Sequence, residues 1–148
     1  MTVRVQEATF DFGAEANAFA TGRTDAGAVV TFTGIVRDLA TTELSKMVIE
    51  HYPGMTERAL EKIEAEARDR WDLRDCLIIH RYGPMEPGDM IMMVATASPH
   101  RVDAFEAAEF LMDYLKSRAP FWKKEYTGDG EDWVAAKDED EDALSRWD

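Results

Sequence analysis

Four basic side chains flank a proline late in the chain: Lys116 and Arg118 precede Pro120, and Lys123 and Lys124 follow it. No acidic residue interrupts this run of the sequence before Glu125. A lysine beside other cations has its ammonium form disfavoured, so it can carry a proton or act as a nucleophile near neutral pH. Because Phe121 and Trp122 lie among the cations, we predict a partly apolar, cationic pocket for a small anionic ligand.

A second set of residues that could attract an anion lies at the start of the helix whose other end carries these cations. Ser98 suits the N-cap and Pro99 the first helical position, which places His100 and Arg101 in the first turn. Backbone N–H groups at a helix N-terminus attract anions. The alternative for the basic residues at the other end is that they complement the helix macrodipole and are solvated. The acidity of the rest of the chain favours the pocket.

The helix itself is predicted from apolar residues at spacings of three and four, which give it one buried face: Phe105, Ala108, Met112, Leu115 and Ala119. Pro120 ends it, and no Gly or Pro interrupts it between Val102 and Leu115.

Composition indicates one ordinary domain, 1–148, with an acidic tail from about 138 that is predicted to be solvated. Hydrophobic residues make up 45% of the chain, enough for a core, and the formal charge of −13 argues against binding nucleic acid or anionic membranes. No apolar run is long enough to span a membrane, so a cytoplasmic protein is expected. The single cysteine, Cys76, excludes an internal disulfide and is expected to be buried.

Alternating and periodic segments predict strands at 3–12, 28–37, 46–52, 75–83, 90–97, 121–126 and 132–136, and further helices at 14–20 and 55–71. The strands at 75–83 and 90–97 should pair as a hairpin across the turn at 84–89. The run 38–45 has no period and is expected to be a mobile loop. Strands and helices do not alternate as in a doubly wound sheet, so we predict an α+β fold with a mostly antiparallel sheet.

The sequence gives little support for metal binding, hydrolysis by a serine nucleophile or nucleotide binding. His51, His80 and His100 form no local metal motif, and His51 and His80 are expected to be hydrogen-bonded structural residues in strands. Serine hydrolase, P-loop and dinucleotide motifs do not occur in the sequence. Acid–base chemistry would therefore fall to lysine or histidine.

The chain resembles the large, catalytic subunit of molybdopterin synthase along nearly its whole length, through VVTFTGIVRD (29–38), EHYPGMTERAL (50–60), HRYG (80–83), PGD (87–89) and PHRVDAFEAAEFLMDYLKSRAPFWKKE (99–125). The resemblance implies an α/β-hammerhead fold and a homodimeric core. It also implies a small ubiquitin-like subunit docked on each large one, as a heterotetramer. In that family the small subunit's C-terminal thiocarboxylate supplies sulfur to cyclic pyranopterin monophosphate, without a metal or other cofactor.

By matching motif, the resemblance implies a catalytic pair, Lys116 and Lys123, and substrate contacts at Ile35, Val36, Arg37, His100, Arg101, Lys116, Lys123, Lys124 and Glu125. Phe121 and Trp122 are expected to contact the partner's tail. The family often carries a basic residue in place of Ile35 and an arginine near Lys137.

Two other function classes compete with this interpretation. One is a non-catalytic anion-binding or scaffold module of the same fold, against which the intact basic residues argue. The other is a metal-dependent hydrolase, which would contain stoichiometric metal.

One distance predicts how the site is assembled. His100 and Lys116 are 16 residues apart on one helix, which at 1.5 Å per residue separates them by about 24 Å. One small ligand cannot contact both ends, so a two-fold dimer should combine Arg37, Lys116 and Lys123 of one subunit with the partner's His100 and the partner's Arg101.

Overall fold

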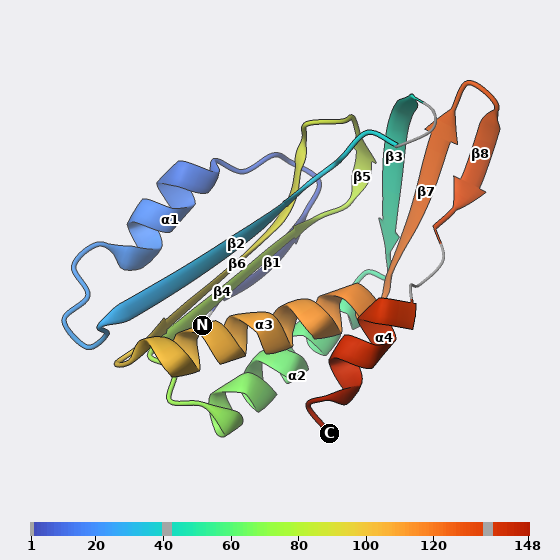
Figure 1. Cartoon of the computed structure of the whole chain (residues 1–148). Coiled ribbons are helices and arrows are strands. Elements are labelled where there is room, and N and C mark those ends of the chain that lie inside the picture. Colours follow the sequence, from blue (N-terminus) through green and yellow to red (C-terminus); the bar gives the residue numbers. More distant parts are fainter. Residues whose placement is uncertain (1, 40–42, 135–137) are drawn as a thin grey trace.

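The computed structural model describes residues 2–39, 43–134 and 138–148. In chain order the elements are β1 (Thr2–Gln6), α1 (Phe12–Ala20), β2 (Ala28–Ile35), β3 (Leu44–His51), α2 (Met55–Arg70), β4 (Asp75–Arg81), β5 (Gly83–Met85), β6 (Met90–Ser98), α3 (Arg101–Ser117), β7 (Phe121–Thr127), β8 (Gly130–Trp133) and α4 (Asp138–Ser145). The predicted α+β class is confirmed, with two sheets rather than one (Figure 1).

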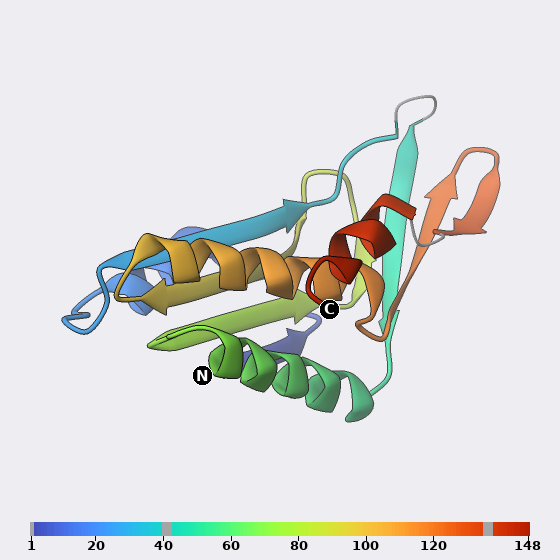
Figure 2. The same ribbon diagram turned by 60° about the horizontal axis from the view of Figure 1, so that its bottom comes forward.

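The larger sheet has the order β1-β4-β6-β2 and is antiparallel except for the β1–β4 pair. Figures 1 and 2 show α1 on one face of this sheet and α2 and α3 on the other. Side chains alternate between the faces of a strand, so Cys76 and Ile78 of β4 join the core under α2 and α3, whereas Leu77 and Ile79 pack with α1.

The smaller sheet has the order β5-β3-β7-β8 and stands at one end of the larger one (Figure 1). The predicted pairing of 75–83 with 90–97 is confirmed, since β4 and β6 are antiparallel neighbours. The chain between them was predicted as a turn only. Its first part forms β5, which leaves the hairpin to pair with β3 and thereby links the two sheets.

The predicted start of α3 is wrong by two residues. Ser98 is still the last residue of β6, fully buried, and its carbonyl accepts the N–H of Gly27 at 3.0 Å. The strand ladder therefore outweighs the N-cap preference of serine, and His100 is the N-cap. The helix is continuous from Arg101 to Ser117, as expected, and ends before Pro120.

The predicted buried face of α3 is also partly wrong. Phe105 is 60% exposed, and the residues that pack on the sheet are Ala104, Ala107, Ala108, Phe110 and Leu111. Both sets satisfy a spacing of three and four, so the period alone could not choose between them. The three alanines of the helix face the sheet, because small side chains let the helix approach it closely.

The C-terminal residues, which were expected to be a solvated acidic segment, contain a helix that is anchored to the domain. Residues 138–145 form α4, and Trp147 beyond it packs edge-on against Trp71 and Phe110, with ring centroids 5.5 and 5.7 Å away. Its indole N–H donates to Asp113 at 2.6 Å, and its carbonyl accepts from Arg70. One large aromatic side chain thus anchors an acidic segment to α2 and α3.

Replacing Trp147 by alanine should lower the free energy of unfolding by about 2–4 kcal/mol, because the variant loses a packed aromatic ring and leaves Asp113 without this donor. Urea unfolding followed by far-UV circular dichroism measures the change. Trp133→Ala is the matched control, since that ring is 54% exposed, and it should cost less than about 1 kcal/mol. Equal losses for the two variants would contradict the anchoring role of Trp147.

Three regions that were interpreted from sequence fall partly or wholly outside the described residues. The predicted loop at 38–45 includes 40–42, and its last residues already belong to β3. The predicted strand at 132–136 is described only to 134, with β8 ending at Trp133. Lys137 lies outside the described residues altogether.

Candidate active site

Lys116 and Lys123 approach one buried imidazole from two different elements. Lys116 is exposed in the last turn of α3, and Lys123 is half-buried on β7, opposite Ile49 of β3. The positive charges of both lysines lower the pKa of His80, so both ammonium groups lie within electrostatic reach of that ring. The fold therefore brings the predicted catalytic pair to the same place.

His80 is 4% exposed near the end of β4. Burial lowers its pKa to about 3, helped by the charges of Lys123 and Lys116 and opposed by a 2.8 Å hydrogen bond from Nδ1 to the carbonyl of Arg81. The imidazole is neutral at physiological pH. The expectation of a hydrogen-bonded structural histidine is confirmed for His80, but nothing in the sequence indicated that the two lysines lie beside it.

The ring of His80 stacks on Phe121, with centroids 3.7 Å apart and planes 16° apart. One face of Phe121 is thereby covered. The exposed member of the predicted tail-contacting pair is Trp122, at 47%. Successive side chains of a strand point to opposite faces, which places Phe121, Lys123 and Glu125 on one face of β7 and Trp122 on the other.

Two of the four cations predicted to form one pocket are paired with acidic residues of other elements. Lys124 forms an ion pair with Glu131 of β8 at 2.9 Å, which raises the pKa of Lys124, and its ammonium group lies 5.1 Å from the centroid of Trp133. Arg118 is paired with Glu141 of α4 at 2.6 Å. These acids follow later in the chain and reach the cations only through the fold, so the local sequence could not show them.

Ile35 is the last residue of β2, and the two residues after it, Val36 and Arg37, are held by a turn rather than by the predicted strand. The N–H of Val36 donates to the carbonyl of Asp89 at 2.8 Å, and the carbonyl of Val36 accepts from Gly88 at 2.7 Å. The side chain of Val36 is 2% exposed and belongs to the core, whereas Ile35 and Arg37 point outward. Gly88 has φ +95° in this turn, a conformation that favours glycine. The turn thus fixes the backbone from which Arg37 projects.

His100 and Arg101 are exposed at the opposite end of α3 from Lys116. Ala28 pairs with Ser98, so the start of α3 lies beside the first residue of β2, while Arg37 follows the last. From that end β2 and α3 run in the same general direction (Figure 1), so Arg37, which follows β2, and Lys116, in the last turn of α3, both lie away from His100 and Arg101.

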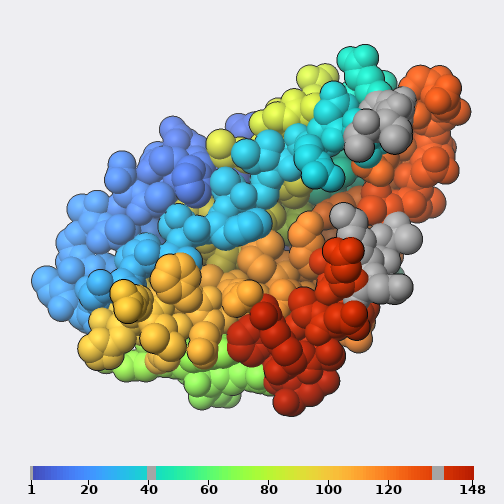
Figure 3. Space-filling view, in the orientation of Figure 1, coloured from blue at the N-terminus to red at the C-terminus, as the bar shows by residue number. Residues whose placement is uncertain are grey.

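An apolar groove runs between β2 and α3, which lie side by side on the face shown in Figure 3. Its volume is about 440 Å³, and it is lined by Val30, Thr31, Phe32, Phe105, Ala108, Glu109 and Met112. Phe32 of β2 is 42% exposed, and Val102 of α3 is 58% exposed. The sequence interpretation missed this surface because it assigned Phe105 to the core.

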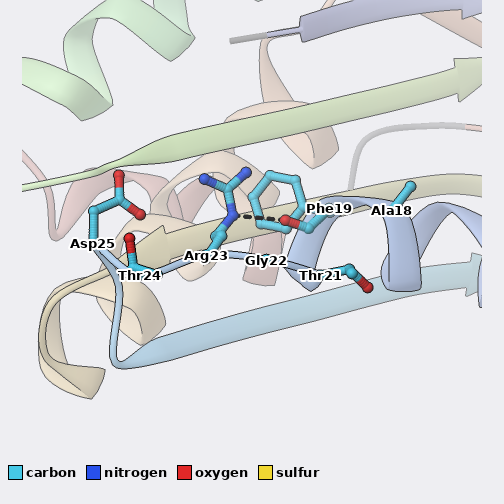
Figure 4. Close-up of a pocket in the computed structure, with 7 residues that line it drawn as sticks. All are labelled: Ala18, Phe19, Thr21, Gly22, Arg23, Thr24 and Asp25. Atoms are coloured by element: carbon cyan, nitrogen blue, oxygen red, sulfur yellow. Dashed lines mark hydrogen bonds between the residues drawn. The ribbon is translucent and has the colours of Figure 1, made fainter.

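A second hollow of similar volume lies at the end of α1 and is lined by Ala18, Phe19, Thr21, Gly22, Arg23, Thr24 and Asp25 (Figure 4). The guanidinium of Arg23 already has partners within the chain, since it donates to the carbonyl of Phe19 and is paired with Asp75. The hollow contains none of the predicted site residues.

No group of three His, Cys, Asp or Glu side chains among residues 2–39, 43–134 and 138–148 is arranged to hold a metal ion. No helix in that part of the chain is long and apolar enough to cross a membrane.

Comparison with known proteins agrees with this geometry. The family model described as MoaE protein matches residues 5–118. The molybdopterin synthase catalytic subunit of Cereibacter sphaeroides is 65% identical, covering 99% of this chain and all of the relative. The solved structure of the molybdopterin biosynthesis MoaE protein from Burkholderia ambifaria has a TM-score of 0.82 at 53% identity and covers 99% of this chain and 98% of the other.

A more distant structure, the complex of subunits 1 and 2 of molybdopterin-converting factor from Helicobacter pylori, shares the fold with a TM-score of 0.75. It is 20% identical and covers 92% of this chain and 90% of the other. The extent of the family match and the near-complete coverage at high identity leave one assignment: the chain belongs to the MoaE family, the catalytic subunits of molybdopterin synthase.

Proposed function

We propose that this chain acts in the cytoplasm and transfers sulfur to cyclic pyranopterin monophosphate, taking it from the C-terminal thiocarboxylate of a small ubiquitin-like subunit. The observation that supports the proposal most is that Lys116 and Lys123, from different elements, both lie near enough to the buried His80 for their charges to lower its pKa, in a chain of this family. Two ammonium groups would stabilise the anionic thiocarboxylate and the carboxylate that replaces it. Either lysine could also hold the proton that the transfer moves.

The substrate's phosphate would be bound by Arg37 and by residues of a second copy of the chain. β2 is an edge strand of the larger sheet and carries eight residues. If two β2 edges pair antiparallel about a two-fold axis, the first residue of one strand meets the last residue of the other. That arrangement places the partner's His100 and the partner's Arg101 near Arg37 and Lys116.

The same pairing would cover the apolar groove beside β2. Phe32, Val102 and Phe105 expose between 42% and 60% of their surface in the single chain. Burying them against a second copy supplies apolar area at the place where the shared site needs the two copies to meet. The homodimer that the family resemblance implies is therefore part of this proposal.

The small subunit's tail would enter near Trp122, the exposed aromatic residue of the basic segment. The two-subunit composition of the H. pylori structure supports such a partner. On titration with the small subunit, Trp122 fluorescence should change and saturate, and Trp122→Phe should remove that change. Trp133→Phe is the control. A signal that survives in Trp122→Phe and disappears in Trp133→Phe would place the tail on β8 instead.

Reconstitution tests the proposal directly. Purified chain, thiocarboxylated small subunit and cyclic pyranopterin monophosphate should together yield the dithiolene product. The same mixture with a small subunit ending in an ordinary carboxylate should yield none. Binding of both ligands without product would instead favour the scaffold alternative.

Neighbouring lysines on β7 provide a matched pair of variants. Lys123→Ala should lower turnover by about 10²- to 10⁴-fold, the usual cost of losing a proton carrier. Lys124→Ala should lower it less than about threefold, because that side chain points to the other face and is paired with Glu131. Initial rates under saturating small subunit measure both. A reversed order would contradict the assignment of Lys123.

A further inference from the structure

His80 lies where the two sheets meet. It belongs to β4 of the larger sheet, whereas Phe121, on which its ring stacks at 3.7 Å, is the first residue of β7 in the smaller sheet. The stacked pair therefore joins the larger sheet to β7. Lys123 lies on β7 two residues after Phe121 and on the same face of the strand. A shift of this ring would move the strand that carries a proposed catalytic residue.

The orientation of the imidazole is fixed by the chain on its other side. A carbonyl oxygen can only accept, so the 2.8 Å contact with the carbonyl of Arg81 requires the proton on Nδ1. Arg81 is itself buried and held by the carbonyls of Glu7 and Met90, at 3.0 and 3.2 Å. With Nδ1 donating, Nε2 carries the free lone pair and can only accept a hydrogen bond.

The charged and titratable groups that act on this ring come from three elements. Lys123 of β7, Lys116 of α3 and His51 of β3 all disfavour a positive charge on His80. A protonated imidazole would add a further cation beside two ammonium groups. A neutral imidazole avoids that repulsion and leaves Nε2 able to accept a hydrogen bond.

We propose that His80 is a positioning residue of the active site. Its ring holds β7 in place through Phe121 and offers Nε2 as an acceptor to Lys123, which lies two residues beyond Phe121 on the same face of β7. This inference rests on the proposed function, because it assigns His80 a task only if the two lysines carry the reaction.

The test uses the reconstituted synthase and two substitutions that divide the roles of the ring. His80→Phe keeps a ring to stack on Phe121 but removes the acceptor, and His80→Gln keeps an acceptor but loses the stack. His80→Phe should lower kcat by about 10- to 100-fold, as expected for a slightly misplaced catalytic group, with KM changed less than about threefold. Lys123 loses an acceptor, so the limb of the pH–rate profile that Lys123 controls should move to lower pH.

His80→Gln should return that limb toward its wild-type position while kcat stays low. Trp71→Phe is the matched control, because Trp71 also packs on an aromatic ring, that of Phe110 at 5.2 Å, but away from the lysines. It should leave kcat within about threefold. A folded His80→Phe protein with wild-type kcat and pH profile would overturn the inference, and so would an equal loss in Trp71→Phe.

Phe121→Leu covers the case in which His80→Phe does not fold. It removes the stack and keeps the acceptor, so kcat should fall without a shift of the pH limb. Unchanged kcat in that variant would overturn the positioning role. Lys123→Ala separates this inference from the function on which it rests: if that variant keeps wild-type activity, the lysine assignment itself fails.

Discussion

Replacing Lys116 by alanine abolishes or nearly abolishes product formation, by about 10²- to 10⁴-fold, and leaves the protein folded. Lys116 is exposed at the end of α3, and no hydrogen bond or ion pair of this side chain with another described residue supports the fold. Its substitution should therefore leave the midpoint of urea unfolding within experimental scatter. The rate of dithiolene formation in a single turnover, with excess thiocarboxylated small subunit, measures the loss.

Arg118→Ala is the matched control for Lys116→Ala. It removes a cation two residues away that is paired with Glu141 and points toward α4. The activity of this variant should stay within about twofold, because an exposed ion pair contributes little.

Lys116→Arg adds a further distinction, since arginine keeps the charge but does not release its proton. Recovery in Lys116→Arg would assign Lys116 to charge stabilisation, and failure to recover would assign it to proton transfer. Near wild-type turnover in purified Lys116→Ala would remove Lys116 from the mechanism.

Mixing two inactive proteins restores activity if each site is shared between copies. Lys116→Ala damages one half of the site and Arg101→Ala the other, and the continuous helix from 101 to 117 keeps the two positions about 22 Å apart in one chain. In a mixed dimer one of the two sites receives both mutations and the other receives neither. Random exchange makes half of the dimers mixed, so about a quarter of the wild-type activity should return.

Subunit exchange must be verified in the same sample, for example by energy transfer between differently labelled copies. The double variant, Lys116→Ala with Arg101→Ala in one chain, mixed with wild type, is the control. It should give no more activity than the wild-type sites predict. A mixture of the two single variants that exchanges subunits and stays inactive contradicts the shared site, whatever the oligomeric state.

Regular elements and the basic segment could be predicted from sequence because their signals are local. Proline at 120, the periodic spacing of α3 and the β-branched run of β2 each act within a few residues, and each element was found near its predicted place. The failures share one cause. Ser98 remains in a strand because β2 pairs with it, Lys124 and Arg118 find acids from β8 and α4, and the buried face of α3 is chosen by the sheet.

The residues of the candidate site likewise divide into those that local sequence predicts and those that it does not. Lys116 and Lys123 could be named from the sequence, but the imidazole between them comes from a strand more than thirty residues earlier in the chain. Nothing near His80 in the sequence distinguishes it from His51. The distinction arises only when the two sheets meet and one histidine is covered by Phe121.

The open edge of β2 also has a consequence for how the protein behaves in dilute solution. The outer edge of this eight-residue strand is free of a strand partner and lies next to exposed aromatic side chains, which makes the lone chain a template for strand addition by any other chain. If two copies close this edge on each other, folding and assembly become one concentration-dependent equilibrium, and the melting temperature rises with protein concentration. Cells that make little of the protein would then hold a larger fraction of it in the aggregation-prone form.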